Sequence, residues 1–313
     1  MSVGFVLAII AGVVVLNVGL AFFTALTARQ AEAAAPARGR FIEVGNARLH
    51  YLDRGSGPVV VMVHGLGGNL RNFYELIDRV ALTCRVVAVD RPGSGYSRMM
   101  SGAHPSLAAQ ATIIAEFIHK LDLDRPLLVG HSLGGALVLA LALEHRHCVR
   151  SLVLISALSQ VEPVPPAIFK SLAIRSSTLR WLIAWTLMVP LGRIAHRATL
   201  QALFAPELVP EGFDVNSSTV LGLRPMSFIA ASKDMVSVSN ELALMTRRYP
   251  SLTIPVDVIF GREDPILDHQ VHGGGLVAVL PNATWHLIEG GHMIPVTMPD
   301  KVTDVIKIAA ARV

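Results

Sequence analysis

Charged residues are scarce in this sequence. Asp, Glu, Lys and Arg make up 16% of its 313 residues, whereas hydrophobic residues make up 52%. Aromatic residues are also few, at 6%, and no run of basic residues accompanies the net charge of +4. Because nucleic-acid-binding surfaces are typically basic and rich in stacking side chains, no nucleic acid partner is expected. A cationic face beside an anionic bilayer explains the charge more simply.

Cysteines and metal-ligand patterns are scarce too. Two cysteines, Cys84 and Cys148, are too few for a disulfide framework, and both lie in apolar surroundings typical of core thiols. None of the twelve histidines is paired at the spacing of metal ligands. We therefore expect neither a metal nor another cofactor.

The N-terminal stretch from Val3 to Leu26 contains no charged side chain. It is long enough to span a bilayer as a helix, and it is longer than the apolar core of a signal peptide. No Lys or Arg precedes it. We therefore predict a transmembrane anchor over residues 1–28. A signal sequence is the alternative, because the small residues of 31–35 offer a cleavage site.

The residues after this stretch predict a linker and an orientation. Residues 29–40 are rich in alanine and contain one proline, which favours a short linker. Arg29, Arg38 and Arg40 are opposed only by Glu32. An excess of positive charge marks the cytoplasmic side of a span, so the domain that follows is expected in the cytoplasm, with export as the alternative.

Apolar strand-like runs alternate with helical patterns along the rest of the chain. This alternation predicts an α/β fold with a mostly parallel sheet and helices on both faces. We assign the core to residues 41–158 and 236–313. The expected strands are 41–44, 47–52, 59–63, 85–89, 126–129, 149–155, 255–260 and 284–288, and the expected helices are 69–81, 106–121, 136–142, 270–279 and 300–311.

The alternation is interrupted over residues 159–235, which are helical and apolar in pattern. No acidic residue lies between Glu162 and Glu207, although five basic residues do. An insertion of this kind predicts a helical cap over the carboxyl edge of the sheet. Its apolar residues form either the core of the cap itself or a substrate channel, and its basic residues suit a surface that faces a membrane.

The segment Gly130 to Gly134 reads Gly-His-Ser-Leu-Gly and joins an apolar strand to an apolar helix. A Gly-x-Ser-x-Gly sequence in that context places the serine on a tight strand-to-helix turn, which only small neighbours allow. The turn exposes the hydroxyl of Ser132. It also directs the N–H of Leu133, at the start of the helix, toward any oxyanion formed there.

Two further residues at strand ends have the chemistry that an active serine needs. A serine hydroxyl becomes nucleophilic when a base takes its proton, and a carboxylate fixes the tautomer of that base. Asp264 and His292 each follow a predicted strand, and the ends of parallel strands share one edge of the sheet. The order Ser132, Asp264, His292 is the order expected in this fold.

Five segments in this order resemble the α/β-hydrolase superfamily from about Phe41 onward. They are His64-Gly65, the Asp90 to Ser97 loop, Gly130 to Gly135, Gly261 to Asp264 and Gly291-His292.

That resemblance implies that Ser132 is the nucleophile, His292 the base and Asp264 the acid that orients it. It also implies that the N–H groups of Leu66 and Leu133 form the oxyanion hole. Glu263 and Asp268 are rivals for the acid; we expect Glu263 to face outward and Asp268 to begin the next helix. His64 and His131 are expected to have structural roles.

These residues predict a serine hydrolase that cleaves an apolar carboxylic ester, similar to an esterase or monoacylglycerol lipase. Relatives that open epoxides or remove halide carry aspartate at the position of Ser132, so both activities are disfavoured. The alternatives on the same triad are a carbon–carbon bond hydrolase and a cofactor-free haloperoxidase or perhydrolase; a binding protein without turnover is a third class.

If His292 is the base, turnover should rise as an ordinary histidine loses its proton, at about pH 6 to 7.

Overall fold

A nine-stranded sheet forms the centre of the described part of the chain. The computed structural model describes residues 2–100, 106–162 and 164–312. The strand order is β1-β2-β4-β3-β6-β7-β8-β9, and β5 pairs with β2. Neighbours from β4 through β9 are parallel, whereas β1, β2 and β5 join antiparallel. The strands are β1 Arg40–Val44, β2 Ala47–Arg54, β3 Val59–Val63, β4 Arg85–Val89, β5 Arg98–Met99, β6 Leu127–His131, β7 Ser151–Ile155, β8 Val256–Gly261 and β9 Ala283–Ile288.

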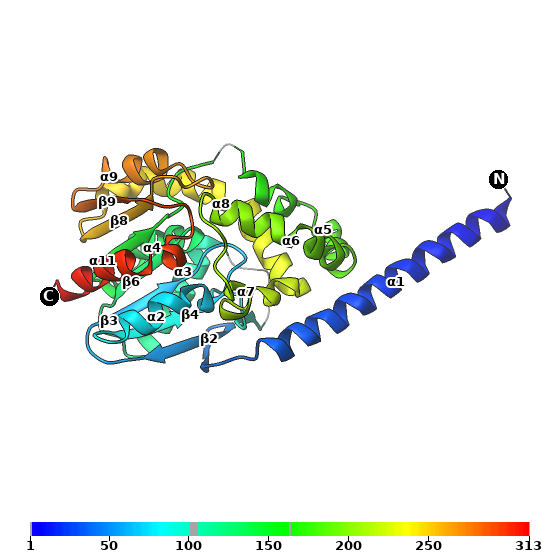
Figure 1. Ribbon diagram of the computed structural model, residues 1–313, viewed down its shortest axis with the longest axis horizontal. Coiled ribbons are helices and arrows are strands. Elements are labelled where there is room, and N and C mark those ends of the chain that lie inside the picture. The colour runs from blue at the N-terminus through cyan, green and yellow to red at the C-terminus, as the bar shows by residue number, and fades with distance from the viewer. Residues whose placement is uncertain (1, 101–105, 163, 313) are drawn as a thin grey trace.

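Helices cover both faces of this sheet (Figure 1). On β3, Val61 and Val63 pack with the side of α3 and α4, whereas Val60 and Met62 pack with the side of α2 and α11. A strand buried on both faces is continuously apolar, as the sequence of β3 is. The flanking helices are η1 Leu70–Phe73, α2 Tyr74–Val80, α3 Leu107–Lys120, α4 Leu133–Glu144, η2 Arg146–Cys148, η6 Gln270–Gly274, α9 Gly275–Val277, α10 Ile294–Thr297 and α11 Pro299–Ala311.

Between β7 and β8 the described chain is helical, and these helices lie to one side of the carboxyl ends of the strands (Figure 1). They are η3 Ala167–Leu172, α5 Ser177–Trp185, α6 Met188–Phe204, α7 Phe213–Asn216, η4 Thr219–Leu223, α8 Pro225–Met245 and η5 Thr246–Ser251. The predicted α/β fold with an inserted helical cap is therefore confirmed. The predicted boundary at residue 235 is wrong, because it cuts through α8, which continues unbroken to pack against α3 and α4 of the core.

The N-terminal helix α1 is longer than predicted. It spans Val3–Ala34, so residues 29–34 of the predicted linker 29–40 are helical. Alanine favours helix, and this end packs on the cap: Thr24, Thr27 and Ala31 are buried, and Glu32 forms an ion pair with Arg224. The rest of α1 projects from the domain (Figure 1) and is long and apolar enough to cross a membrane, a test that a signal sequence also passes.

Candidate active site

Ser132 occupies a strained turn between β6 and α4. Its φ and ψ are 54° and −123°, in a region that non-glycine residues rarely adopt. The turn is so tight that a Cβ on Gly134 would lie 2.1 Å from the Val63 carbonyl oxygen. Two backbone hydrogen bonds of 3.0 Å, to Ile155 and from Leu158, hold the serine in place. The strain is therefore supported by the surrounding sheet.

His292 and Asp264 form a buried pair on the loops after β9 and β8. The Nδ1 of His292 lies 2.8 Å from Oδ2 of Asp264, and their side chains are 2% and 0% exposed. The N–H groups of Ile266 and Leu267 donate to Oδ1 of Asp264 at 2.9 and 3.0 Å. Burial alone would raise the pKa of Asp264, but His292 and these amides lower it below its usual value. A carboxylate at this position keeps the proton on Nδ1 and leaves Nε2 to accept one.

Ser132 and His292 line one cavity of about 120 Å³ at the carboxyl edge of the sheet. Among the described residues, no hydrogen bond joins the Ser132 hydroxyl to the imidazole. Catalytic hydrogen bonds are often long without substrate, and rotation about the Cα–Cβ bond moves the serine oxygen. The structure thus brings Ser132, Asp264 and His292 to one place, without a hydrogen bond between the Ser132 hydroxyl and the His292 imidazole.

The predicted oxyanion loop lies directly against Ser132. A Cβ on Gly65 would be 3.0 Å from the Cβ of Ser132, and Leu66 lines the same cavity. Neither the N–H of Leu66 nor that of Leu133 has a hydrogen-bond acceptor among the described residues. Both amides are therefore available to a developing negative charge.

A buried ion pair, which the sequence did not predict, ties this loop to the cap. The guanidinium of Arg91 donates to Asp234 of α8 at 2.9 Å, to Gln110 at 3.0 Å and to the carbonyl oxygen of Gly65 at 3.3 Å. Arg91 also donates its backbone N–H to Nε2 of His64, whose Nδ1 bonds the same carbonyl. Arg91 belongs to the Asp90 to Ser97 motif, but its ion-pair partner Asp234 lies 143 residues away in the chain.

His64 and His131, for which the sequence predicts structural roles, are both buried, and their burial favours the uncharged form. Burial, and then the charge of Arg91, lower the pKa of His64 to about 4. Burial, and then the neighbouring charge of His292, lower the pKa of His131 to about 3. His131 contacts the carbonyl oxygen of His292 through Nε2 at 3.1 Å, so it supports the loop that carries the candidate base.

These two pKa values predict a loss of stability in acid. Unfolded histidine takes up a proton near pH 6.5, while folded His64 and His131 do not, so stability should fall as the pH drops from about 6.5 toward 4. We expect about 2 kcal/mol or more per histidine at pH 4.5. Urea unfolding of wild type and His131→Gln at pH 7 and pH 4.5 measures this. An equal pH-dependent loss in both proteins would contradict it.

The rival carboxylates are engaged elsewhere. Glu263 is exposed and accepts the Gly290 N–H at 2.6 Å. Asp268 accepts from Gln270 and Val271 at 2.7 and 3.1 Å, as a residue at the start of a helix does. Across residues 2–100, 106–162 and 164–312, no group of three potential metal ligands occurs.

An apolar pocket of about 50 Å³ opens beside Ser132 under the cap. Its walls come from the loops after β3 and β8, from η3 and from α8, and its apolar members include Leu66, Phe169, Met235, Val238, Leu242 and Leu267. This pocket can hold an apolar group next to the hydroxyl.

Comparisons with known proteins concern the fold and the family of this chain. A family model described as the alpha/beta hydrolase fold matches residues 58–299. Haloalkane dehalogenase 2 of Mycobacterium tuberculosis is 26% identical over 287 residues, which cover 87% of this chain and 94% of that protein. The 2-hydroxy-6-oxo-2,4-heptadienoate hydrolase of Pseudomonas putida is 36% identical over 122 residues, which cover 38% of this chain and 44% of that protein.

Solved structures have the same fold. An esterase from Thermogutta terrifontis superposes with a TM-score of 0.72 and 21% identity, covering 86% of this chain and 97% of its own. A bacterial membrane phospholipase A superposes with a TM-score of 0.69 and 21% identity, and the match covers 99% of this chain and 98% of that one.

Proposed function

Since this chain belongs to the alpha/beta hydrolase fold family, we propose that it is a serine hydrolase that cleaves apolar carboxylic esters. The observation that carries the proposal is the buried His292–Asp264 pair at the cavity that Ser132 also lines. This is the arrangement that acyl transfer by a serine requires.

In the proposed reaction, Oγ of Ser132 attacks the ester carbonyl carbon while its proton passes to Nε2 of His292. The carbonyl oxygen becomes an oxyanion, which the N–H groups of Leu66 and Leu133 stabilise. As the C–O bond breaks, the imidazolium protonates the departing alcohol, and an acyl-enzyme remains. Water, deprotonated by the same imidazole, then attacks this ester and releases the acid.

The serine at the turn argues against dehalogenation by this chain. An aspartate carboxylate can displace halide from carbon and form an alkyl ester, whereas a serine with a histidine base is suited to attack on a carbonyl. The residue present is Ser132, so we do not assign dehalogenation to this chain despite 26% identity to haloalkane dehalogenase 2.

The apolar pocket beside Ser132 supports an apolar acyl group as part of the substrate. We expect turnover of p-nitrophenyl esters to rise from acetate through butyrate to octanoate, because each buried methylene adds binding free energy. The series is measured as kcat/KM on the full-length protein. A preference for acetate over every longer chain would exclude a lipid-like ester.

Hydrolysis of a carbon–carbon bond is the second candidate, favoured by the 36% identity to the Pseudomonas putida hydrolase over 122 residues. It would use the same serine and histidine on a vinylogous diketone. Incubating the protein with such a diketone, and following the absorbance of the diketone, distinguishes carbon–carbon bond hydrolysis from ester hydrolysis. Turnover of the diketone, without turnover of any ester in the series, would replace the ester proposal.

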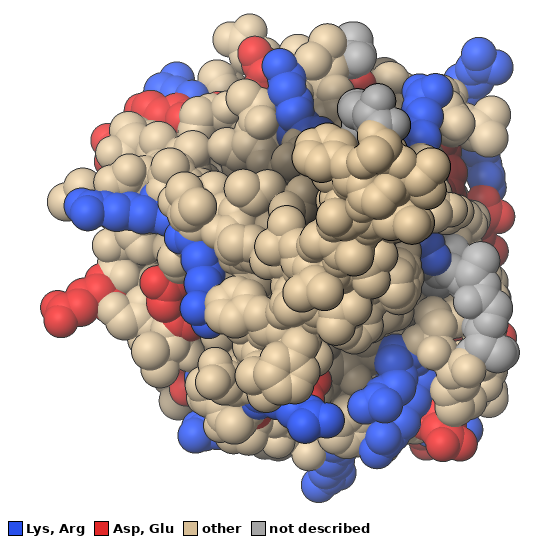
Figure 2. All heavy atoms as spheres, turned by 90° about the vertical axis from the view of Figure 1, so that its right-hand side faces the viewer, with Lys and Arg blue, Asp and Glu red and all other residues tan. Residues whose placement is uncertain are grey.

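We further propose that α1 is retained as a membrane anchor with the catalytic domain on the cytoplasmic side. Figure 2 views the face from which α1 projects, where Lys and Arg side chains lie around a largely uncharged centre. Helix α5 packs beside α1, and exposed apolar residues occur on α5, on α6 and at the turn between them, among them Leu179, Trp181, Leu187 and Leu191. Arg193 lies over the ring of Phe23, 5.3 Å from its centroid.

This anchor predicts the behaviour of a shortened protein. A variant lacking residues 2–22 keeps the buried Thr24, Thr27 and Ala31, so it should stay folded and leave the membrane fraction. Full-length protein should sediment with membranes, retain its N-terminus by mass spectrometry, and be protected from protease outside intact cells. Removal of the N-terminus from the mature protein would mean that the stretch is a signal sequence.

A further inference from the structure

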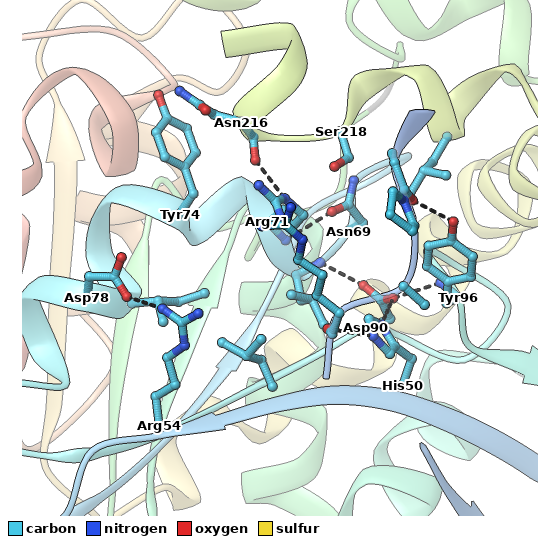
Figure 3. Close-up of a pocket in the computed structure, with 18 residues that line it drawn as sticks. His50, Arg54, Asn69, Arg71, Tyr74, Asp78, Asp90, Tyr96, Asn216 and Ser218 are labelled. Atoms are coloured by element: carbon cyan, nitrogen blue, oxygen red, sulfur yellow. Dashed lines mark hydrogen bonds and ion pairs between the residues drawn. The ribbon is translucent and has the colours of Figure 1, made fainter. Parts of the chain in front are cut away.

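A separate cavity of about 270 Å³ lies where the segment after α1 meets β2 and η1 (Figure 3). Neither Ser132 nor His292 lines it. Three arginines do, namely Arg38, Arg54 and Arg71, together with the polar side chains of Asn69, Tyr74, Asn216 and Ser218. They come from different elements, and the fold brings their positive charges around one space.

The positive charge of this cavity is only partly neutralised. Arg54 is paired with Asp78 at 2.5 Å. Arg71 donates Nε–H to the carbonyl oxygen of Asn216 at 2.8 Å, and neither Arg38 nor Arg71 has a carboxylate partner among the described residues. Partial burial, and then the charges of Arg38 and Arg54, lower the pKa of Arg71. The arginines therefore repel one another, and a bound anion would relieve that repulsion.

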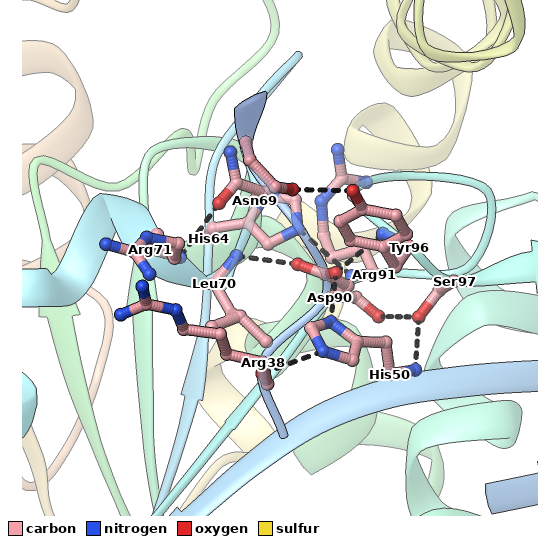
Figure 4. A network of polar contacts seen from close by, with 12 residues as sticks. Arg38, His50, His64, Asn69, Leu70, Arg71, Asp90, Arg91, Tyr96 and Ser97 are labelled. Atoms are coloured by element: carbon pink, nitrogen blue, oxygen red, sulfur yellow. Dashed lines mark hydrogen bonds and ion pairs between the residues drawn. The ribbon is translucent and has the colours of Figure 1, made fainter. Parts of the chain in front are cut away.

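The other carboxylate in the cavity wall, Asp90, is already fully engaged (Figure 4). Its Oδ1 accepts the Leu70 N–H at 2.7 Å, and its Oδ2 lies 2.8 Å from Nδ1 of His50. His50 in turn contacts the carbonyl oxygen of Arg38 through Nε2 at 2.9 Å. This buried network fixes the backbone of Arg38 and of Leu70, the residue before Arg71. The backbone positions of both arginines are therefore restrained.

We propose that Arg38, Arg54 and Arg71 bind a phosphate group in this cavity. A guanidinium offers parallel N–H donors that match two oxygens of a phosphate, and arginine clusters are suited to such groups. Figure 4 shows the side chains of Arg38 and Arg71 extending to the same side of the Asp90 network.

The phosphate can belong to a water-soluble ester or to a lipid headgroup. A second cavity of about 450 Å³ between α1, α6 and η4 shares Ala35 and Ser218 with the first. Its lining combines apolar residues such as Val215 and Leu223 with charged residues such as Arg193 and Asp214. An acyl chain attached to a phosphate in the first cavity would extend along the apolar part of this lining toward α1. Ala28, the last residue before the charged Arg29, lies six residues before Ala34, about 9 Å along the helix.

The first experiment measures binding of inorganic phosphate to the full-length protein in detergent by equilibrium dialysis. We expect saturable binding that weakens at least about tenfold in the double variant Arg38→Gln/Arg71→Gln, because charge-assisted hydrogen bonds are lost. The matched control is Arg197→Gln/Arg247→Gln, which removes the same charge from two exposed arginines outside the cavity. Arg38→Gln alone changes only an exposed side chain and should give a smaller loss in the same direction.

The second experiment separates the two sources of phosphate. Protein is reconstituted in phosphatidylcholine nanodiscs with or without phosphatidic acid, and retained lipid is counted by native mass spectrometry. Retention of phosphatidic acid that the double variant loses identifies a lipid headgroup, and binding of inorganic phosphate alone identifies a soluble ester. Equal binding by the double variant and its control, or no saturable binding of either probe, would overturn the proposal. Ser132→Ala should bind phosphate like wild type, so this site is tested independently of catalysis.

Discussion

Replacing Ser132 with alanine is expected to lower kcat for ester hydrolysis by about 10³ to 10⁶-fold. The variant removes the atom that would form the acyl-enzyme, while the buried His292–Asp264 pair and the two free amides remain. Any residual rate would come from binding and the oxyanion hole alone. The measurement is kcat on the preferred p-nitrophenyl ester, with circular dichroism to check that the variant is folded.

The matched control is Ser239→Ala, because Ser239 lines the apolar pocket without lying on the strained turn. It should keep activity within a few fold. A fluorophosphonate probe should label wild type and Ser239→Ala but not Ser132→Ala. An intact wild-type protein that neither labels nor turns over any ester would instead support a binding protein without catalysis.

Asp264→Asn is expected to lower kcat by about 10⁴-fold with little change in KM. The amide still accepts the N–H groups of Ile266 and Leu267, so the loop keeps its shape. It does not stabilise an imidazolium, and its NH₂ group favours the tautomer that leaves His292 without a base at Nε2. Thermal unfolding accompanies the kinetics to show that the protein remains folded.

Glu263→Gln and Asp268→Asn serve as controls for the acid. Glu263 accepts the Gly290 amide and Asp268 accepts the first amides of η6, so each change should cost activity far less than Asp264→Asn. If either control lowered kcat more than Asp264→Asn does, the acid would be reassigned to that residue.

Local sequence was sufficient to predict the turn at Ser132 and the described strands other than β5, the short Arg98–Met99 strand. Continuous apolar runs such as residues 59–63 indicate strands covered on both faces, and the structure has β3 there. The glycines around Ser132 were informative because the turn has no room for a Cβ at Gly134. In both cases neighbouring residues largely determine the backbone conformation.

Local sequence was insufficient where contacts across the chain set the outcome. The alanines of residues 31–35 suit a linker, a cleavage site or a helix equally, and packing of Ala31 and the Glu32–Arg224 pair continue α1 through most of them. The limit of the cap at residue 235 failed for the same reason, since contacts with α3 and α4 extend α8 into the core.

The sequence by itself determined the fold class, the uncharged N-terminal stretch and which serine, histidine and aspartate to consider together. These features are carried by periodicity, by glycine placement and by the order of short motifs. Tertiary structure alone decided that Asp264 faces His292, that Arg91 reaches Asp234, and that Arg38, Arg54 and Arg71 share a cavity. The physical reason is that these electrostatic and hydrogen-bonded contacts act over a few ångströms in space, between residues separated by up to 143 positions in the chain.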